Sequence, residues 1–352
     1  VLMQHTFREA RRFSDASAIT DLDALPWHIG VDLFFIISGF IMMHTAGATF
    51  RQPHASRAFL TRRLIRIAPS YWIFTTLMIV AALILGDRLH TTRFEPLHAL
   101  LSYLFVPHLR PGYADQINPI LALGWTLVYE MFFYVVFALA LRFDKEKGVA
   151  ALAATFIALF TGARFGLFTP ALNVFWSDSI MFAFLLGIGA HQALVAQRGR
   201  GEGALWALAL AGIGLGLMTG SFWTERFLQL DLPALMIFLA LYRARYGALQ
   251  PLLVKLGDAS YALYLGHPFV LTAGSLAFGA GGLGVALGMA TATWLYVAVC
   301  VAATFALAFA FFRFVETPMT RALMKSAFAR RLLDPTAGAA PSPVAPRGAA
   351  LP

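Results

Sequence analysis

Long apolar segments follow one another along nearly the whole chain, with short polar segments between them. A helix needs about 20 apolar residues to cross the hydrocarbon core of a bilayer. Segments that approach or reach this length lie near residues 28–46, 68–86, 122–142, 149–162, 178–196, 204–219, 230–243, 259–279 and 285–313. The pattern predicts an all-α fold: a polytopic integral membrane helix bundle within residues 1–330, with no soluble domain.

Three other segments complete the pattern. Residues 1–7 are typical of the tail of a truncated first helix, which brings the prediction to about ten transmembrane helices. Residues 96–106 are too short for a span and predict a re-entrant or interfacial piece. Residues 334–352 are rich in Pro, Ala and Gly and predict a disordered tail.

The polar segments suggest an orientation. Residues 51–67, RQPHASRAFLTRRLIRI, are rich in arginine, and short loops rich in Lys and Arg stay in the cytoplasm. Alternation from there predicts that both termini, including the tail, are cytoplasmic. Most other loops agree with this orientation, although 8–27 carries Arg8, Arg11 and Arg12 on the opposite side.

Composition narrows the class of protein further. The 352 residues are 59% hydrophobic and only 13% charged, too few polar residues for a large soluble core. The net charge of +9 fits cytoplasmic Lys and Arg, and nothing besides charge favours nucleic acid. The single cysteine, Cys300, excludes a disulfide within the chain, and the nine histidines form no metal-binding motif, so we expect no metal.

A few ionisable residues interrupt the apolar segments, and a charge at mid-bilayer costs about 2.5–3.5 kcal/mol on insertion scales. Among them are His5 and Asp32, which we expect at similar depth on helices joined by one loop. A carboxylate beside an imidazole sets its tautomer and raises its basicity, so the two predict a catalytic pair. Alternatively, Asp32 is a helix-start acid and His5 a hydrogen-bonded packing residue.

Glu130 lies further along, in LGWTLVYEMFFYVVF, with no Lys or Arg within a turn. In a helix it shares a face with Tyr134 and Thr126. Trp125, Tyr129 and Tyr134 supply aromatic faces and hydroxyls of the kind that bind sugar rings. The alternative is an aromatic belt with one structural acid.

Arginines also cluster before the second long segment, in FLTRRLIRIAPSYW, where Arg62, Arg63 and Arg66 have helical spacing. They anchor the helix on the cytoplasmic side, or their guanidinium groups bind phosphates, as an acyl-CoA would require.

The segment LGDASYALYLGHPFV places His267 within an apolar run, with Tyr264 on the same face and Pro268 next to it. This arrangement predicts the lining of a substrate channel, or a histidine that bonds a carbonyl freed by the proline. Near the end of the chain, Glu316 is expected to pair with Arg313 or Arg321.

Five segments, in order, resemble the membrane-bound acyltransferase-3 family, and in particular its bacterial exopolysaccharide O-acetyltransferases. The resemblance rests on GVDLFFIISGFIM, FLTRRLIRIAPSYW, LGWTLVYEMFFY, LGDASYALYLGHPFV and FRFVETPMTR. The family's first helix carries an Arg followed by a His. MQHTF matches the His end, which assigns that role to His5, whereas the Arg position would fall before residue 1, because the chain is clipped or its gene start is misplaced.

The resemblance implies a bacterial inner-membrane enzyme that moves an acyl group, usually acetyl, from cytoplasmic acyl-CoA to a hydroxyl of an exopolysaccharide or lipid-linked saccharide. Acetyl-CoA is then a co-substrate, and no cofactor is bound. His5 is expected to be the general base or a transient acyl carrier, oriented by Asp32 or Glu130. Acyl-CoA would meet Arg62, Arg63, Arg66, Tyr71 and Trp72, and the saccharide Trp125, Tyr129, Tyr134, Tyr264 and His267.

Two other classes of protein would share some of these features. A transporter or flippase of a lipid-linked or small polar substrate also has buried acids, a broken helix and an aromatic path. The chain lacks a matching pair of Gly- or Pro-broken helices in two halves, which disfavours this class. A non-catalytic membrane sensor is the third alternative.

Overall fold

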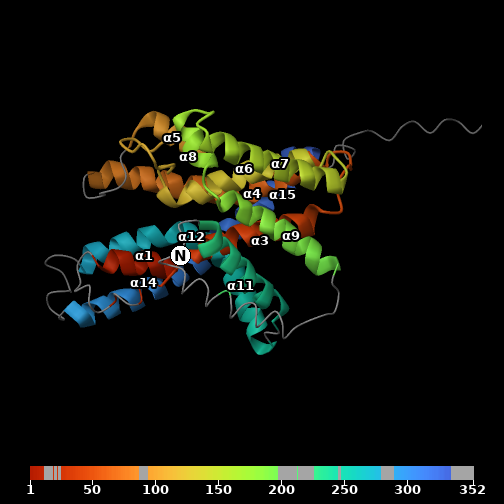
Figure 1. The fold of residues 1–352 in the computed structure, drawn as a ribbon. Helices are drawn as coiled ribbons and strands as arrows, with labels where there is room; N and C mark the ends of the chain where they lie inside the picture. Colours follow the sequence, from red (N-terminus) through yellow and green to blue (C-terminus); the bar gives the residue numbers. More distant parts are fainter. Residues whose placement is uncertain are drawn as a thin grey trace, which may run out of the picture.

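A computed structural model describes residues 1–11, 19, 22, 25–86, 94–196, 212, 226–244, 247–278 and 289–333. Over these residues the chain is helical and contains no strand, as predicted (Figure 1). Two π-helical turns, Phe227–Asp231 and Phe312–Glu316, precede α11 and α15. The α-helices are α1 (Leu2–Ala10), α3 (Ile29–Ala46), α4 (Ala55–Leu85), α5 (Pro96–Tyr103), α6 (Trp125–Ala140), α7 (Lys145–Arg164), α8 (Pro170–Trp176), α9 (Ile180–Ala196), α11 (Leu232–Arg243), α12 (Gln250–Phe278), α14 (Met289–Phe311), α15 (Thr317–Lys325) and α16 (Ala327–Leu333).

The predicted count of about ten spans is not confirmed within the described residues. Six helices in the described ranges are long and apolar enough to cross a bilayer, and seven if α11 and α12, which are bent by 106° from each other, form one broken span. The helix α1 has only nine residues, and α5 has eight, so α5 is too short to span, as predicted. The predicted span 204–219 and the tail 334–352 lie outside the described residues, apart from Gly212.

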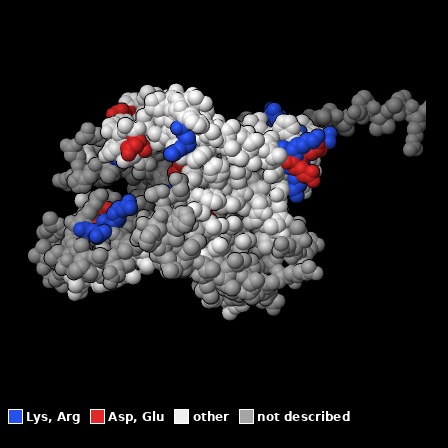
Figure 2. Space-filling model, in the orientation of Figure 1, with Lys and Arg blue, Asp and Glu red and all other residues white. Residues whose placement is uncertain are grey.

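The helices pack in three neighbouring groups. The first contains α4, α6 and α7, with α5 and α8 beside one end; the second contains α3, α9 and α11; the third contains α1, α12 and α14 (Figure 1). The groups are joined where α3 meets α6 and where α12 meets α4. On the face shown in Figure 2, the coloured charged groups lie toward the two ends, with an uncharged belt between them, as expected where side chains face lipid.

The helix α4 begins thirteen residues earlier than the predicted span at 68. Arginine is a good helix former, and its long side chain lets the charged end reach a polar environment from an apolar helix. Arg62, Arg63 and Arg66 therefore stand on the helix itself and not in a loop.

The helices α3 and α9 cross at close range. A Cβ atom added to Gly39 would lie 2.1 Å from the carbonyl oxygen of Phe184, and one added to Gly187 would lie 2.0 Å from that of Ile36. Small residues allow such close approach of backbones in membrane helices. Each glycine thus accommodates the backbone of the partner helix.

Replacing Gly187 by alanine is expected to destabilise the protein by about 1–3 kcal/mol or more, because backbone atoms must move to admit the methyl group. Gly189 offers a matched control on the same helix, since a Cβ there meets nothing within 4 Å. Its replacement by alanine should be neutral or stabilising, because alanine favours a helix over glycine by up to about 1 kcal/mol. Thermal unfolding in detergent would compare the two, and equal effects would contradict the crossing.

Candidate functional site

Glu130 is the one acidic residue of α6. Its side chain is buried, and its Oε1 atom accepts hydrogen bonds from the hydroxyls of Ser38, at 3.0 Å, and Tyr134. The shared face of Glu130 and Tyr134, one helical turn apart, is confirmed. Ser38 comes from α3 and was not predicted, because nothing local in the sequence relates the two helices.

Arg63 reaches the same group of residues from α4. Its guanidinium lies 5.4 Å from the ring centroid of Tyr134 and 5.5 Å from that of Phe59, within the range of a cation–π interaction. It also donates to the hydroxyl of Thr45 at 3.3 Å. The guanidinium is therefore held beside the hydrogen-bonded pair of Tyr134 and Glu130.

A pocket of about 570 Å³ lies on the other side of Arg63, and we call it the donor pocket. All three predicted arginines line it, and Phe59 and Arg63 separate it from Tyr134. The volume falls in the range of pockets that take small-molecule ligands. Its lining comprises Ile41, Thr45, Ala46, Thr49, Gln52, Pro53, His54, Ala55, Ala58, Phe59, Arg62, Arg63, Arg66 and Leu333.

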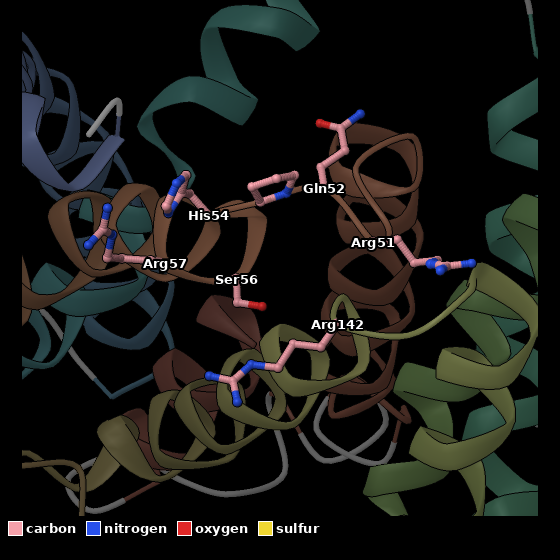
Figure 3. A pocket seen from close by; sticks show the side chains of 7 residues that line it. Arg51, Gln52, His54, Ser56, Arg57 and Arg142 are labelled. Carbon is pink, nitrogen blue, oxygen red and sulfur yellow. The ribbon is translucent and has the colours of Figure 1, made fainter. Parts of the chain in front are cut away.

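A second pocket, of about 430 Å³, adjoins the donor pocket and shares Gln52, Pro53 and His54 with it. Arg51, Arg57 and Arg142 are among its other lining residues (Figure 3). We call it the basic pocket. Residue patterns gave no sign of it, since Arg142 lies far along the chain from the others.

Glu316 pairs differently from the expectation. Its carboxylate is buried and lies 3.9 Å from Arg66, so the expected partners Arg313 and Arg321 are wrong. The π-helical turn at Phe312–Glu316 shifts the helical register there and changes which face of the helix carries Glu316. The acid thus stands behind one of the arginines of the donor pocket.

Tyr71 and Trp72 do not line the donor pocket. The Tyr71 hydroxyl donates to the carbonyl of Ser102 at 3.1 Å, and the Trp72 ring nitrogen donates to that of Tyr103 at 2.9 Å. They lie at least one further helical turn along α4 from Arg66 and fasten α5 to it. The structure therefore places both residues outside the donor pocket, and their contact with acyl-CoA stays a prediction.

A pair of histidines links α5 to the loop that follows it. His98 and His108 are 2.6 Å apart between ring nitrogens, and burial lowers the pKa of His98 to about 4. His98 is therefore neutral at pH 7 and can share a hydrogen bond with its neighbour.

His5 on α1 lies against His267 on α12, with ring centroids 5.2 Å apart. The Nδ1 atom of His267 donates to the carbonyl of Leu263 at 3.3 Å, and among the described residues nothing bonds its Nε2 atom. Tyr264 lies next to His267, with ring centroids 6.1 Å apart, and its hydroxyl is 2.8 Å from that of Thr126 on α6. A series of polar side chains thus leads from His5 to the helix that carries Glu130, one turn from Thr126.

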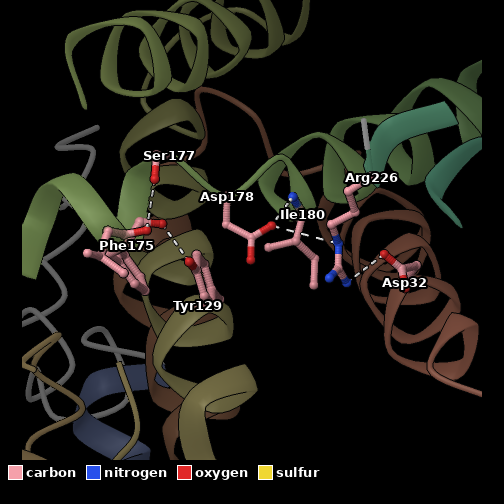
Figure 4. Close-up of polar contacts among 8 residues, drawn as sticks. Asp32, Tyr129, Phe175, Ser177, Asp178, Ile180 and Arg226 are labelled. Carbon is pink, nitrogen blue, oxygen red and sulfur yellow. Dashed lines mark hydrogen bonds and ion pairs between the residues drawn. The ribbon is translucent and has the colours of Figure 1, made fainter. Parts of the chain in front are cut away.

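Asp32 is buried and forms an ion pair with Arg226, whose guanidinium lies 2.8 Å from its Oδ1 atom (Figure 4). Arg226 also lies 3.7 Å from Asp178. No contact joins Asp32 to His5 within the part of the chain that the structure describes, so the predicted pair is wrong: the two residues have different partners on other helices.

Arg226 and Asp231 were missed as site residues. Asp231 stands at the start of the apolar segment 230–243, where an acid is costly, and Arg226 precedes it by five residues in the same segment SFWTERFLQLD. That local pattern could have indicated that Arg226 and Asp231 matter. No local pattern could have indicated that Arg226 pairs with Asp32 on α3, because the two residues are 194 positions apart.

The aromatic residues predicted to bind the saccharide have mixed surroundings. The Tyr129 hydroxyl donates to the carbonyl of Phe175, and the two rings stack with centroids 4.1 Å apart (Figure 4). Tyr129 is buried and committed to packing α8 against α6. Trp125 is partly exposed beside it, with ring centroids 5.9 Å apart.

In the ranges that the structure covers, no three His, Cys, Asp or Glu side chains converge as metal ligands would. The acidic side chains and histidines described above instead contact arginines, hydroxyls or each other, as Asp32, Glu130 and His98 do. The site thus contains three features. These are the arginine-lined donor pocket, the buried Glu130 bonded to Tyr134 beside it, and the imidazole pair of His5 and His267.

Comparison with known proteins identifies the class. The family model of the acyltransferase domain called acyltransferase 3 matches residues 19–313, so the chain belongs to this family and is an acyltransferase. It is 34% identical over 263 residues to the exopolysaccharide production protein ExoZ of Rhizobium meliloti (strain 1021), covering 72% of this chain and 80% of that protein. It is also 27% identical over 293 residues to acyltransferase MdmB of Streptomyces mycarofaciens, covering 73% of this chain and 71% of that protein. No solved structure matches it significantly.

Proposed function

We propose that this chain is an integral membrane O-acyltransferase that moves an acetyl group from acetyl-CoA to a hydroxyl of an exopolysaccharide or lipid-linked saccharide. The observation that carries the proposal is the donor pocket. Three arginines line it, and its inner wall, Arg63 and Phe59, contacts the Tyr134 that bonds Glu130. Family membership supports acyl transfer, and the similarity to the exopolysaccharide production protein ExoZ supports a polysaccharide as acceptor.

The donor enters from the side where Arg62, Arg63 and Arg66 lie, which we place in the cytoplasm of a bacterium, with the C-terminus on the same side. Guanidinium groups bind phosphate oxygens in bidentate fashion, so these arginines suit the diphosphate of acyl-CoA. The narrow pantetheine arm then extends past Phe59 into the bundle. Glu130 is a positioning residue in this scheme, because it holds Tyr134, whose ring contacts Arg63.

His5 acts as the general base. One of its ring nitrogens takes the proton of the sugar hydroxyl while the hydroxyl oxygen bonds to the thioester carbonyl carbon. The carbon–sulfur bond breaks, and the CoA thiolate leaves and takes the proton from the imidazolium. A route through acyl-His5 splits the same transfer into two steps. His267 and Tyr264 orient His5, and Trp125, at the end of α6, offers a face to the saccharide.

The test uses the full chain in nanodiscs with radiolabelled acetyl-CoA. The acceptor is bacterial exopolysaccharide stripped of its O-acetyl groups by mild alkali. We expect label in the polymer that alkali releases as acetate. Movement of a lipid-linked saccharide across sealed vesicles without any covalent change, and no ester in the polymer, would establish a flippase instead.

Replacing Arg63 by alanine is expected to raise the KM for acetyl-CoA about tenfold to a hundredfold, because a charge-assisted bond to phosphate and the contact with Tyr134 are lost together. Arg63→Lys should recover part of the loss, since it keeps the charge without the fork. The control is Arg164→Ala, which removes an exposed arginine from the far end of α7 and should change nothing. An unchanged KM for acetyl-CoA in Arg63→Ala would show that the donor pocket does not bind acetyl-CoA.

A further inference from the structure

The basic pocket is built by two elements that lie far apart in the sequence. Residues 51–54 form the turn before α4, Ser56 and Arg57 open that helix, and Arg142 follows the end of α6. In Figure 3, Arg51 and Arg57 stand on opposite sides of the opening, with Ser56 and Arg142 between them. No acidic residue lines this pocket.

The pocket is held in shape by bonds between these elements. The Ser56 hydroxyl donates to the carbonyl of Ala138 at 2.5 Å, and the backbone N–H of Arg51 donates to the carbonyl of Leu141 at 2.8 Å. Arg51 and His54 adopt positive φ angles of 61° and 67°, which fold the turn tightly against α6. The lining is therefore preformed.

Its positive charge is only partly neutralised. Arg51 pairs with Asp144 at 2.8 Å, and the hydrogen bond from Arg51 holds the pKa of that carboxyl below its usual value. Arg57 uses its Nε atom on the carbonyl of Leu332 at 3.2 Å, a neutral partner. Arg142 has no ion pair within the described ranges. Two guanidinium groups thus face the pocket without a carboxylate.

The start of α4 adds to this field. Its N-cap residue His54 makes no side-chain cap, and the N-terminus of a helix carries a partial positive charge. An anion in the basic pocket would meet this charge together with the guanidinium groups of Arg57 and Arg142, which have no carboxylate partner among the described residues. A phosphate monoester carries roughly −1.5 to −2 charges at pH 7, which matches two uncompensated arginines.

The position of the pocket indicates which phosphate this is. It shares Gln52, Pro53 and His54 with the donor pocket, so a ligand bound to Arg62, Arg63 and Arg66 can continue into it. A CoA thioester carries a phosphate monoester on its ribose, separated from the diphosphate by the sugar. We propose that the basic pocket binds the ribose 3′-phosphate of the acyl-CoA donor through Arg57 and Arg142, an assignment that rests on the proposed function.

Anionic lipid headgroups share this phosphate chemistry, so the experiment must separate the two sources. Binding of CoA and of 3′-dephospho-CoA to the full chain is measured by calorimetry in nanodiscs of neutral phosphatidylcholine. Wild type should bind CoA about tenfold or more tightly than 3′-dephospho-CoA. Arg142→Ala should lose this preference, with the affinity for 3′-dephospho-CoA unchanged. Arg57→Gln should lose it as well, because the proposal assigns the 3′-phosphate to both arginines.

Arg62→Ala is the matched control, because it lines only the donor pocket and should weaken both ligands by the same factor. Three results would overturn the subsite. The first is no binding of CoA, and the second is an unchanged preference for CoA over 3′-dephospho-CoA in Arg142→Ala and Arg57→Gln. The third comes from thermal unfolding with added phosphatidylglycerol: if Arg142→Ala changes only the stabilisation of the protein by this lipid, the pocket binds an anionic headgroup. Arg142-dependent binding of CoA without acyl transfer would leave the subsite standing and disprove the proposed function alone.

Discussion

Replacing His5 by alanine is expected to lower the rate of acyl transfer by about one hundredfold to ten thousandfold, the range that a general base contributes. The side chain sits beside His267, and the ring removed is the one that we propose takes the proton of the sugar hydroxyl. The measurement is the initial rate of acetyl incorporation into polysaccharide stripped of its O-acetyl groups, at saturating acetyl-CoA. The KM for acetyl-CoA should stay nearly constant, because the arginines of the donor pocket are untouched.

His44 provides the control for this experiment. It is exposed at the end of α3, with its ring stacked on Phe40, and lies outside the proposed site, so His44→Ala should retain nearly full activity. His267→Gln should lie between the two, since it removes a neighbour that orients His5 and not the base itself. Wild-type rates in well-folded His5→Ala protein would exclude His5 from the chemistry.

Replacing Arg226 by alanine is expected to destabilise the protein by about 3–5 kcal/mol, because it leaves the buried carboxylate of Asp32 without its cation. The side chain of Asp32 is 0% exposed, and Asp178 lies 3.7 Å from the same guanidinium, so two acids lose their common partner. Thermal or denaturant unfolding in detergent, followed by circular dichroism, measures the loss.

The surface ion pair of Arg51 and Asp144 is the matched comparison. These side chains are 69% and 46% exposed, so Asp144→Ala should change stability far less than Arg226→Ala does. Combining Arg226→Gln with Asp32→Asn should recover part of the loss of the single variant, because the buried charge of Asp32 is then removed together with its cation. Equal effects of the buried and the exposed pair would show that Asp32 is solvated and that the pair is not buried.

The apolar pattern placed most helices correctly because bilayer thickness imposes a minimum length on any spanning segment. The segments near 28–46 and 122–142 correspond closely to α3 and α6. The pattern failed at α4, whose charged first turns are as helical as its apolar remainder. Its count of about ten spans is not confirmed: the described helices give six or seven, and the predicted span 204–219 lies outside the described residues apart from Gly212.

Side-chain partners were predictable only within one helix. Glu130 and Tyr134 meet because residues four apart lie on the same face. Tyr129 and Tyr71 looked equally suited to bind ligand, yet their hydroxyls bond the carbonyls of Phe175 and Ser102. A tyrosine beside a neighbouring helix end finds a backbone acceptor there, and no residue pattern records that proximity.

The sequence by itself determined that this is a helical membrane protein of the acyltransferase 3 family, with arginines in register on one helix and a carboxylate one turn from a tyrosine. Hydrophobic length and helical periodicity are local properties, so they can be read along the chain. Only the tertiary structure decided that Asp32 pairs with Arg226, that His5 lies beside His267, and that Arg57 and Arg142 share a pocket. Those partners depend on the rotation and crossing of helices distant in sequence, which the packing of the whole bundle sets.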